Sequence, residues 1–405
     1  MDKRISRFRG KISPVLFCGS LIVLLSIGLR TSFGLFLKPM SIDLGWGREI
    51  FAFAMALQNL LWGAFQPFAG AVADRWGSGR VLALGGFIYA VGLYFMSTTA
   101  SPIALYMSGG VLVALGLSGA GLAIVIGAVG RSVSPESRSL ALGIVTAAAS
   151  MGQLLVVQAG HAFLSRYGWS TAFQLLGLLG LFMIPLSAAL TGRVEQTTEM
   201  RDQSLLEALT EARRHRGFWF LTAGFFVCGF HVAFIAVHLP AYLNDSGLSM
   251  GLGAVSLSVI GLFNIIGSTI SGILGGKKSK KKLLSGLYLL RAAAFLAFIL
   301  IPLSVWSVLC FAAVIGFLWL GTVPLTSGLV AQIFGPRYMS MLFGIVFFSH
   351  QVGSFIGVWL GGYLFDTTGS YMIVWWLSVA LGLLAAALHV PINEQPLDRT
   401  QRPGG

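Results

Sequence analysis

Charged residues are scarce in this chain, since Asp, Glu, Lys and Arg make up only 10% of its 405 residues. Soluble domains are usually about a quarter charged, so a surface exposed to water on all sides is excluded. Hydrophobic residues account for 56% of the chain, and the mean hydropathy is +0.83. Crossing a bilayer core roughly 30 Å thick takes about 20 apolar residues, and such stretches recur along the whole sequence. The chain is therefore predicted to be a polytopic membrane protein.

Acidic residues are rarer than basic ones, with 14 Asp and Glu against 27 Lys and Arg. Every acid lies in a loop, a terminus or the end of an apolar stretch, and Glu49, Asp74 and Asp366 come nearest to the apolar interior. Exporters of cations and many proton symporters need a carboxylate in mid-span, so the pattern favours an anionic solute. The net charge of +13 is spread over short loops. It indicates membrane topology rather than a surface for nucleic acid, and no nucleic-acid partner is expected.

Cysteine is also rare, and Cys18, Cys228 and Cys310 lie far apart within apolar stretches. This spacing fits neither a metal site nor a disulfide framework. The sequence contains no zinc-type His/Glu pair, no GxSxG elbow and no phosphate-binding loop. We therefore expect no enzyme activity, no cofactor and no metal. An integral-membrane enzyme or sensor is the weaker alternative.

Hydropathy predicts twelve apolar helices. The first follows a basic segment at 1–11 and is too long for the apolar region of a signal peptide, so it is interpreted as a membrane span. With both termini in the cytoplasm, only Lys38, Arg48 and Arg166 lie outside, which satisfies the positive-inside rule. The expected spans are 14–37, 48–72, 79–98, 103–128, 137–162, 169–191, 217–243, 252–275, 284–303, 305–333, 338–364 and 370–391.

An internal repeat divides the chain into halves. Gly143 and Gly152 recur as Gly344 and Gly353, at an offset of 201 residues that is half of the chain. Because each half holds an even number of spans, the two repeats have the same orientation, and a solute site is expected near the midplane between them. The predicted organisation is a first bundle at 1–191, a cytoplasmic linker with an amphipathic helix at 192–216, a second bundle at 217–392 and a cytoplasmic tail at 393–405.

The loop after the second span reads Gly70-Ala-Val-Ala-Asp74-Arg75-Trp-Gly77-Ser-Gly-Arg80. It resembles the cytoplasmic loop signature of the major facilitator superfamily, and the resemblance covers nearly the whole chain. The fold that it implies is an all-α integral membrane protein with twelve transmembrane helices in two six-helix, pseudo-symmetric bundles. In that family the loop is a conformational switch rather than a substrate site.

Each residue type in this loop has a physical reason. Gly70 is expected to allow close approach of a neighbouring helix, and Asp74 to pair with a helix terminus or a basic side chain. Gly77 permits a tight turn. In the second half Gly276 stands at the position of Asp74, so a lock at that loop is expected to be weaker or differently built.

Three further stretches, at 28–40, 228–242 and 348–351, resemble the bacterial oxalate/formate antiporter and monocarboxylate transporter branch of the superfamily. The resemblance implies a carrier of small carboxylates. Members of that branch commonly hold the anion with basic residues on helices 8 and 11. Here the eighth span carries Asn264 and no Arg or Lys, and the eleventh offers His350 in place of a lysine.

Two arginines lie within predicted spans, where insertion of a basic residue costs roughly 2.5–3.5 kcal/mol. Arg30 is in the first span, which lines the cavity in the superfamily. It is the first candidate for gripping a carboxylate, which a guanidinium can hold through two hydrogen bonds. The alternative is snorkelling to the outer interface. Arg291 is in the peripheral ninth span, where snorkelling to the inside or a structural pair is the better interpretation.

Histidines supply the candidate proton carriers. His231 and His238 are seven residues apart and share one face of the seventh span, where they either carry a proton or form structural hydrogen bonds. Other candidates for substrate binding have packing or interhelical hydrogen bonding as the alternative: Tyr242, Asn264, Trp319, His350 and Gln351.

The function expected from these observations is secondary active transport of a small organic anion, a monocarboxylate or dicarboxylate, by alternating access. The expected location is a bacterial inner membrane, with protons and membrane lipids as further partners and a monomer as the working unit. The alternative is a drug or amphiphile efflux transporter of the same fold. A channel is disfavoured, because two repeated halves suit alternating access.

Overall fold

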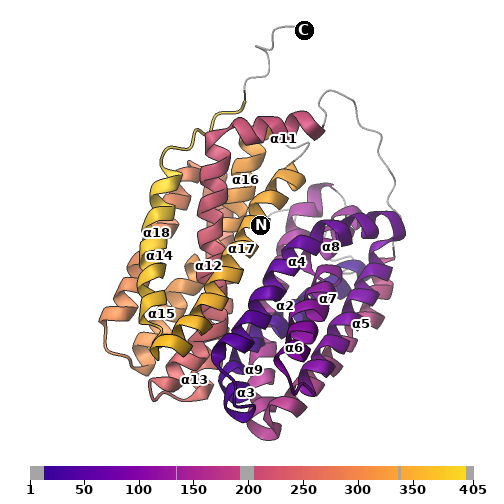
Figure 1. Cartoon of the computed structure of the whole chain (residues 1–405). Helices are drawn as coiled ribbons and strands as arrows, with labels where there is room; N and C mark the ends of the chain where they lie inside the picture. The colour runs from indigo at the N-terminus through magenta and orange to yellow at the C-terminus, as the bar shows by residue number, and fades with distance from the viewer. Residues whose placement is uncertain (1–12, 134, 192–204, 336–338, 398–405) are drawn as a thin grey trace, which may run out of the picture. The chain divides into compact units, whose positions relative to one another are not determined.

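The computed structural model describes residues 13–133, 135–191, 205–335 and 339–397, and within these residues the regular structure is helical throughout (Figure 1). Parts of three predicted segments lie outside the described residues: the basic segment at 1–11, the first part of the linker at 192–204, and the end of the tail at 398–405.

Contacts between residues divide the chain into two compact units. The first unit comprises the described residues within Met1–Trp46 and Leu61–Gln196, and the second those within Gly47–Leu60 and Thr197–Gly405. The second unit therefore includes the first half of α4 (Arg48–Trp76), although α4 belongs to the first sequence repeat. The predicted bounds of the bundles, the linker and the tail stay predictions.

The helices of the first unit pack around α2 and α5, with α2 lying along the first part of α9 (Figure 1). A π-helical turn at Tyr106–Leu112 joins α6 to α7, and short 3-10 turns follow α2 and α10. The helices are α2 (Pro14–Thr31), α3 (Leu37–Asp43), the second half of α4, α5 (Ser78–Ser97), α6 (Pro102–Leu105), α7 (Val113–Gly119), α8 (Leu122–Ser132), α9 (Pro135–Leu181) and α10 (Met183–Ser187).

In the second unit the longest helix contact joins α12 and α17, and α14 packs along α18 (Figure 1). The expected linker helix is present as α11, with Ala208 and Ala212 buried and Leu206 exposed. The helices of this unit are α11 (Leu205–Arg214), α12 (Arg216–Asp245), α13 (Met250–Gly275), α14 (Lys280–Leu300), α15 (Val305–Leu318), α16 (Thr322–Phe334), α17 (Met339–Thr368) and α18 (Met372–His389).

One pair of the repeated glycines, Gly152 and Gly353, marks equivalent helix crossings, whereas a Cβ at Gly143 or Gly344 would meet no described atom within 4 Å. In the first unit, a Cβ atom at Gly152 of α9 would overlap the backbone of Leu24 in α2. In the second unit, a Cβ atom at Gly353 of α17 would overlap the backbone of Phe226 in α12. Small residues allow membrane helices to approach closely, so each unit requires glycine at the same point of the repeat.

Among the described residues, ten helical segments are long and apolar enough to cross a membrane. The 51-residue segment Leu140–Leu190 turns at Gly168, whose positive φ of 77° ends one pass and begins another. The 29-residue helix α4 adds a further pass that is less apolar. Counting these segments as passes gives the twelve-helix fold that the sequence predicts.

Two spans that the sequence predicts as continuous helices are broken. The expected helix at 103–128 divides between α7 and α8, and that at 305–333 divides between α15 and α16. At the second break, Pro324 lies in the first turn of α16, where its missing N–H leaves no hydrogen bond unmade. At the first break, a Cβ at Gly121 would overlap the carbonyl of Leu117, so glycine is required there.

Candidate functional site

Arg30 lies in the last turn of α2 in the first unit, where the negative end of the helix dipole favours a cation. Its guanidinium carbon lies 5.0 Å from the centre of the Trp62 ring, within the range of a cation–π contact. The side chain is only partly exposed. Arg30 is therefore held against an aromatic face inside the first unit.

Trp62 connects this arginine to the break between α7 and α8. Its indole N–H donates to Oε1 of Gln66 at 3.0 Å, and Nε2 of Gln66 donates to the carbonyl of Ser118 at 3.4 Å. The hydroxyl of Ser118 donates in turn to the carbonyl of Trp62 at 3.3 Å. Broken helices with free backbone groups form many transporter binding sites, and Arg30 lies beside such a break.

At the break between α15 and α16, the nearby arginine is Arg291 of α14. Its Nε and Nη2 donate to the carbonyl of Leu318 at 3.0 and 2.6 Å, and Nη2 also donates to the carbonyl of Trp319. Nη1 lies 3.4 Å from the Sγ of Cys228. Arg291 is 2% exposed, so it does not snorkel. It forms the structural pair that the sequence left open, and its partners are the carbonyls at the end of α15.

Asn264 holds the other side of this break. Its Oδ1 accepts the N–H of Leu320 at 3.0 Å, and the asparagine is buried. The Trp319 side chain is buried as well. Both residues were expected to bind substrate, and the structure places both at the broken helix, where Asn264 satisfies a backbone donor.

The other histidine candidates are buried among aromatic rings of the second unit. Nε2 of His231 lies 2.9 Å from the carbonyl of Ser378, and its ring lies 4.7 Å from that of Phe295. Nδ1 of His350 lies 3.1 Å from Oε1 of its neighbour Gln351. These contacts support the structural interpretation of both histidines, and their role in proton transfer stays a prediction.

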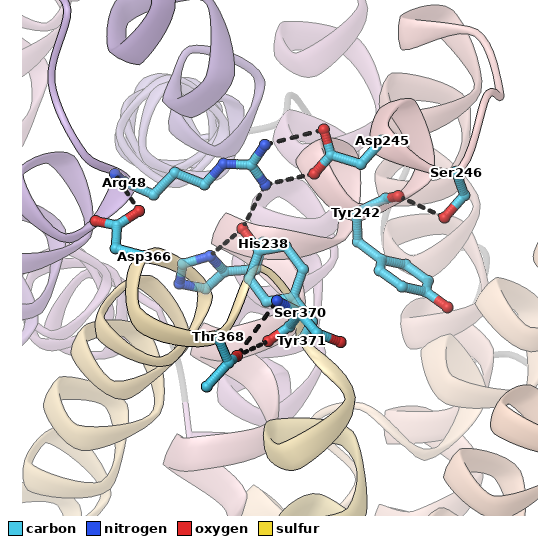
Figure 2. Close-up of polar contacts among 9 residues, drawn as sticks. All are labelled: Arg48, His238, Tyr242, Asp245, Ser246, Asp366, Thr368, Ser370 and Tyr371. Atoms are coloured by element: carbon cyan, nitrogen blue, oxygen red, sulfur yellow. Dashed lines mark hydrogen bonds and ion pairs between the residues drawn. The ribbon is translucent and has the colours of Figure 1, made fainter.

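A charged network that sequence analysis missed lies where α4 begins and α12 ends (Figure 2). Nη1 and Nη2 of Arg48 donate to the two carboxylate oxygens of Asp245 at 2.5 and 2.9 Å, and Nη1 also donates to the hydroxyl of Tyr371 at 3.0 Å. The guanidinium carbon lies 3.6 Å from the centre of the Phe365 ring. Hydrogen bonds, a charge pair and an aromatic face thus surround one guanidinium.

Asp366 binds the same helix end in a different way. Its Oδ1 accepts the backbone N–H of Arg48 at 2.9 Å, and its Oδ2 accepts that of Glu49 at 2.8 Å. A carboxylate at a helix N-terminus satisfies unpaired N–H groups and complements the dipole. Glu49 in turn accepts the indole N–H of Trp359 at 2.9 Å.

His238 and Tyr242 contact this network from α12. Nδ1 of His238 lies 3.2 Å from the Tyr371 hydroxyl, and Nε2 lies 2.8 Å from the carbonyl of Val358. Because the carbonyl of Val358 can only accept, the His238 proton lies on Nε2, and Nδ1 then accepts the proton of the Tyr371 hydroxyl. The Tyr242 ring packs against Tyr371 and Trp375.

In the switch loop, the Asp74 carboxylate pairs with Arg131 of α8 at 3.3 Å, and Arg131 also donates to the Ser78 hydroxyl at 2.7 Å. Gly77 has a φ of 96° and forms the tight turn that was expected. A Cβ at Gly70 would meet no described atom within 4 Å, so this structure does not show the close approach expected there. The two loop arginines, Arg75 and Arg80, are exposed.

The equivalent loop of the second half is built differently, as its missing acid predicts. Lys280 donates to Oε1 of Gln332 in α16 at 2.7 Å. An acidic residue comes instead from the segment after α18, where Glu394 accepts the backbone N–H of Lys281 at 2.8 Å and its carbonyl accepts from Gln332 at 2.9 Å.

The second unit also contains a cavity of about 760 Å³ between α13, α14 and α15, which is open to the surface, since Leu290, Ile301 and Val314 in its walls are exposed. Its walls are almost entirely apolar and include Phe263, Phe298, Phe311 and Phe317, with Ser307 and Cys310 as the polar exceptions. A charged solute would find no counter-charge there. The cavity suits hydrocarbon rather than an organic anion.

Comparison with known proteins gives consistent matches. The sequence model described as Major Facilitator Superfamily matches residues 16–348. An uncharacterized MFS-type transporter of Bacillus subtilis, YcxA, is 26% identical over 90% of this chain and 91% of its own length. The oxalate:formate antiporter of Oxalobacter formigenes is 25% identical over 84% and 82%, and rat monocarboxylate transporter 12 is 25% identical over 82% and 76%.

A solved structure shows the same fold. A bacterial homologue of the human lysosomal transporter Spinster, crystallised in an inward-facing and occupied conformation, aligns with a TM-score of 0.71 at 16% identity. The alignment covers 93% of this chain and 95% of that one. At this identity the likeness concerns the arrangement of helices.

Proposed function

This chain belongs to the major facilitator superfamily, and we propose that it is a secondary active transporter that carries a small organic anion, a monocarboxylate or dicarboxylate, by alternating access. That the protein is a transporter rather than an enzyme follows from the family and its relatives. The solute class is our inference from the residues of the two units.

The observation that carries the proposal is the position of Arg30. Its guanidinium lies 5.0 Å from Trp62, which hydrogen-bonds through Gln66 to the broken helix of the first unit. A guanidinium presents parallel N–H donors that match the two oxygens of a carboxylate. A carboxylate solute would also compensate a positive charge that is expensive to place among apolar helices.

The relatives support the same solute class. One is an oxalate:formate antiporter and several are monocarboxylate transporters, although identities stay near 25%. We further propose cytoplasmic termini in a bacterial inner membrane, a monomeric working unit and, where protons are coupled, a role for His231 or His238. On this topology, the network around Arg48 lies at the outer end of the second unit.

The test is transport of radiolabelled small carboxylates into proteoliposomes, combined with thermal stabilisation of the purified protein by the same acids. Losing a charge-assisted pair costs about 1.5–3 kcal/mol, so Arg30→Ala is expected to weaken carboxylate binding about 10- to 150-fold. Arg166→Ala, which removes an exposed arginine of the same unit, serves as the control. An Arg30→Ala protein with wild-type uptake would refute the role of Arg30.

One observation favours the alternative of amphiphile efflux, namely the apolar cavity between α13, α14 and α15. If the protein exports amphiphiles, hydrophobic cations or neutral amphiphiles will stabilise it and carboxylates will not. The thermal assay with both ligand classes therefore separates the two functions. In that outcome Arg30 becomes a structural residue.

A further inference from the structure

The guanidinium of Arg48 lies in a site shaped for a carboxylate, and an internal carboxylate occupies it. Arg48 is 10% exposed and binds both oxygens of Asp245, while Tyr371 and Phe365 fix the guanidinium from two other sides. Figure 2 shows the planar group of Arg48 directed edge-on at Asp245. A bidentate pair of this kind is the geometry in which arginine recognises carboxylates in general.

The two acids of this network are not equivalent. Asp366 caps the first turn of α4, where the helix dipole favours a negative charge. Asp245 is the last residue of α12, where the dipole of its own helix opposes a negative charge. The side chain of Asp245 is also 26% exposed, so water and small solutes reach it. Asp245 is therefore the carboxylate that can be replaced.

A free carboxylate could make the same two hydrogen bonds to Arg48 without lying at the end of α12. The rest of the site would remain in place, because the Tyr371 hydroxyl is held by His238, and His238 by the carbonyl of Val358. The site thus has a cation, a hydroxyl and an aromatic wall that do not depend on Asp245.

We propose that Arg48, Tyr371 and Phe365 form a second binding site for small carboxylates, which Asp245 occupies in this structure and which a free organic anion takes by displacing Asp245. The exchange would release the end of α12 from the start of α4. Since residues 47–60 of α4 group with the second unit and residues from Leu61 onward with the first, the exchange would loosen a contact that assigns α4 to the second unit. This inference rests on the proposed function in one respect, namely that the displacing anion is the transported solute.

The experiment uses full-length purified protein with Asp245→Ala, which removes the internal carboxylate and leaves the Arg48 site open. Thermal stability is measured against increasing acetate or formate, with chloride at equal ionic strength. Because a ligand of the folded state raises its stability with concentration, acetate is expected to raise the Tm of Asp245→Ala more than that of the wild type. Chloride is expected to give no such difference.

The matched control is the double variant Asp245→Ala/Arg48→Gln, in which the extra acetate response is expected to disappear. Asp245→Asn, which keeps the side-chain shape, is the second variant if Asp245→Ala does not fold. In Asp245→Asn, removal of the internal competitor is expected to lower the apparent Kd for acetate about tenfold, equal to about 1.4 kcal/mol. An equal acetate response in the single and double variants, or an equal effect of chloride, would overturn the proposal.

The same titration in an Arg30→Ala background separates this site from the proposed function. If the extra acetate response of Asp245→Ala persists without Arg30, the Arg48 site binds carboxylates independently. If uptake fails to depend on Arg30 while this response persists, the proposed role of Arg30 is wrong and the second site stands. If the response vanishes together with Arg30, the proposal of an independent second site is wrong.

Discussion

Replacing Arg291 by leucine would separate the structural arginine of this protein from the proposed substrate arginine. Arg291 bonds the carbonyls of Leu318 and Trp319, at the point where α15 ends inside the second unit. Leucine keeps an apolar side chain there but donates no hydrogen bond. The backbone carbonyls would then face a buried, largely apolar environment without their present donors.

The size of the effect follows from this geometry. An unsatisfied buried carbonyl costs about 1–3 kcal/mol, and Arg291→Leu removes the donor of two such carbonyls. Leucine also removes the free-energy cost of burying the guanidinium charge, which offsets part of this loss. Hydrogen bonds between side chains within membranes average only about 0.6 kcal/mol. We therefore expect a loss of about 3 kcal/mol. At roughly 2–4 °C per kcal/mol for a unit of this size, the Tm falls by about 6–12 °C.

Thermal unfolding of purified protein in detergent measures this shift. Arg291→Lys is expected to lie between the wild type and Arg291→Leu, because lysine keeps the charge but not the forked donors. Arg30→Leu is the matched control in the first unit, with a smaller loss of stability and a larger loss of carboxylate binding. An Arg291→Leu protein of wild-type Tm that no longer binds carboxylates would refute the reasoning and place Arg291 in the substrate site.

Two further predictions concern the loop that follows α4 and the start of α14. Asp74→Asn is expected to slow turnover in proteoliposomes with little change in KM. Stability should change by less than about 1 kcal/mol, because the pair of Asp74 with Arg131 is exposed. A variant with a raised KM and an unchanged turnover rate would contradict the switch role. Glu394→Gln is expected to weaken the cap of α14 by about 0.5–1 kcal/mol and to speed hydrogen exchange at the Lys281 amide, which Glu394 now accepts. The control Asn393→Ala should leave exchange at that amide unchanged. Equal exchange in the wild type and both variants would show that Glu394 does not hold the helix end.

The fold was predictable because its signals are local or periodic. Apolar length and the basic loops each need only a short window of sequence, and the glycines repeated at an offset of 201 residues appear when the two halves are compared. The close helix crossings at Gly152 and Gly353 explain why glycine stands at the same point of both halves. The broken spans were missed because hydropathy averages over a break. Pro324 was only a weak signal, since α4 and α12 contain Pro67 and Pro240 without a break.

The network around Arg48 could not be predicted in the same way. Asp245 lies 197 positions after Arg48 in the sequence, and Asp366 lies 318 positions after it. In sequence each is an ordinary charge at a span end, and the positive-inside rule accounts for Arg48 as one of three outer basic residues. Only the packing of α12 and α17 beside α4 brings them together. A charge at a span end is thus a weak signal until its distant partner is known.

The two breaks also show that the same point of a repeat can be held by different residue types. In the second unit two carbonyls at the end of α15 are held by Arg291, and the next backbone N–H by Asn264, so a charged side chain has a structural task. In the first unit a neutral amide, Gln66, holds the carbonyl of Ser118. Arg30 contacts Trp62, whose indole N–H donates to the same glutamine. A glutamine therefore holds the backbone of the first break, while the guanidinium of Arg30 lies against an aromatic face. We expect that guanidinium to bind a carboxylate solute, a role that the Arg30→Ala and Arg291→Leu proteins test in opposite directions.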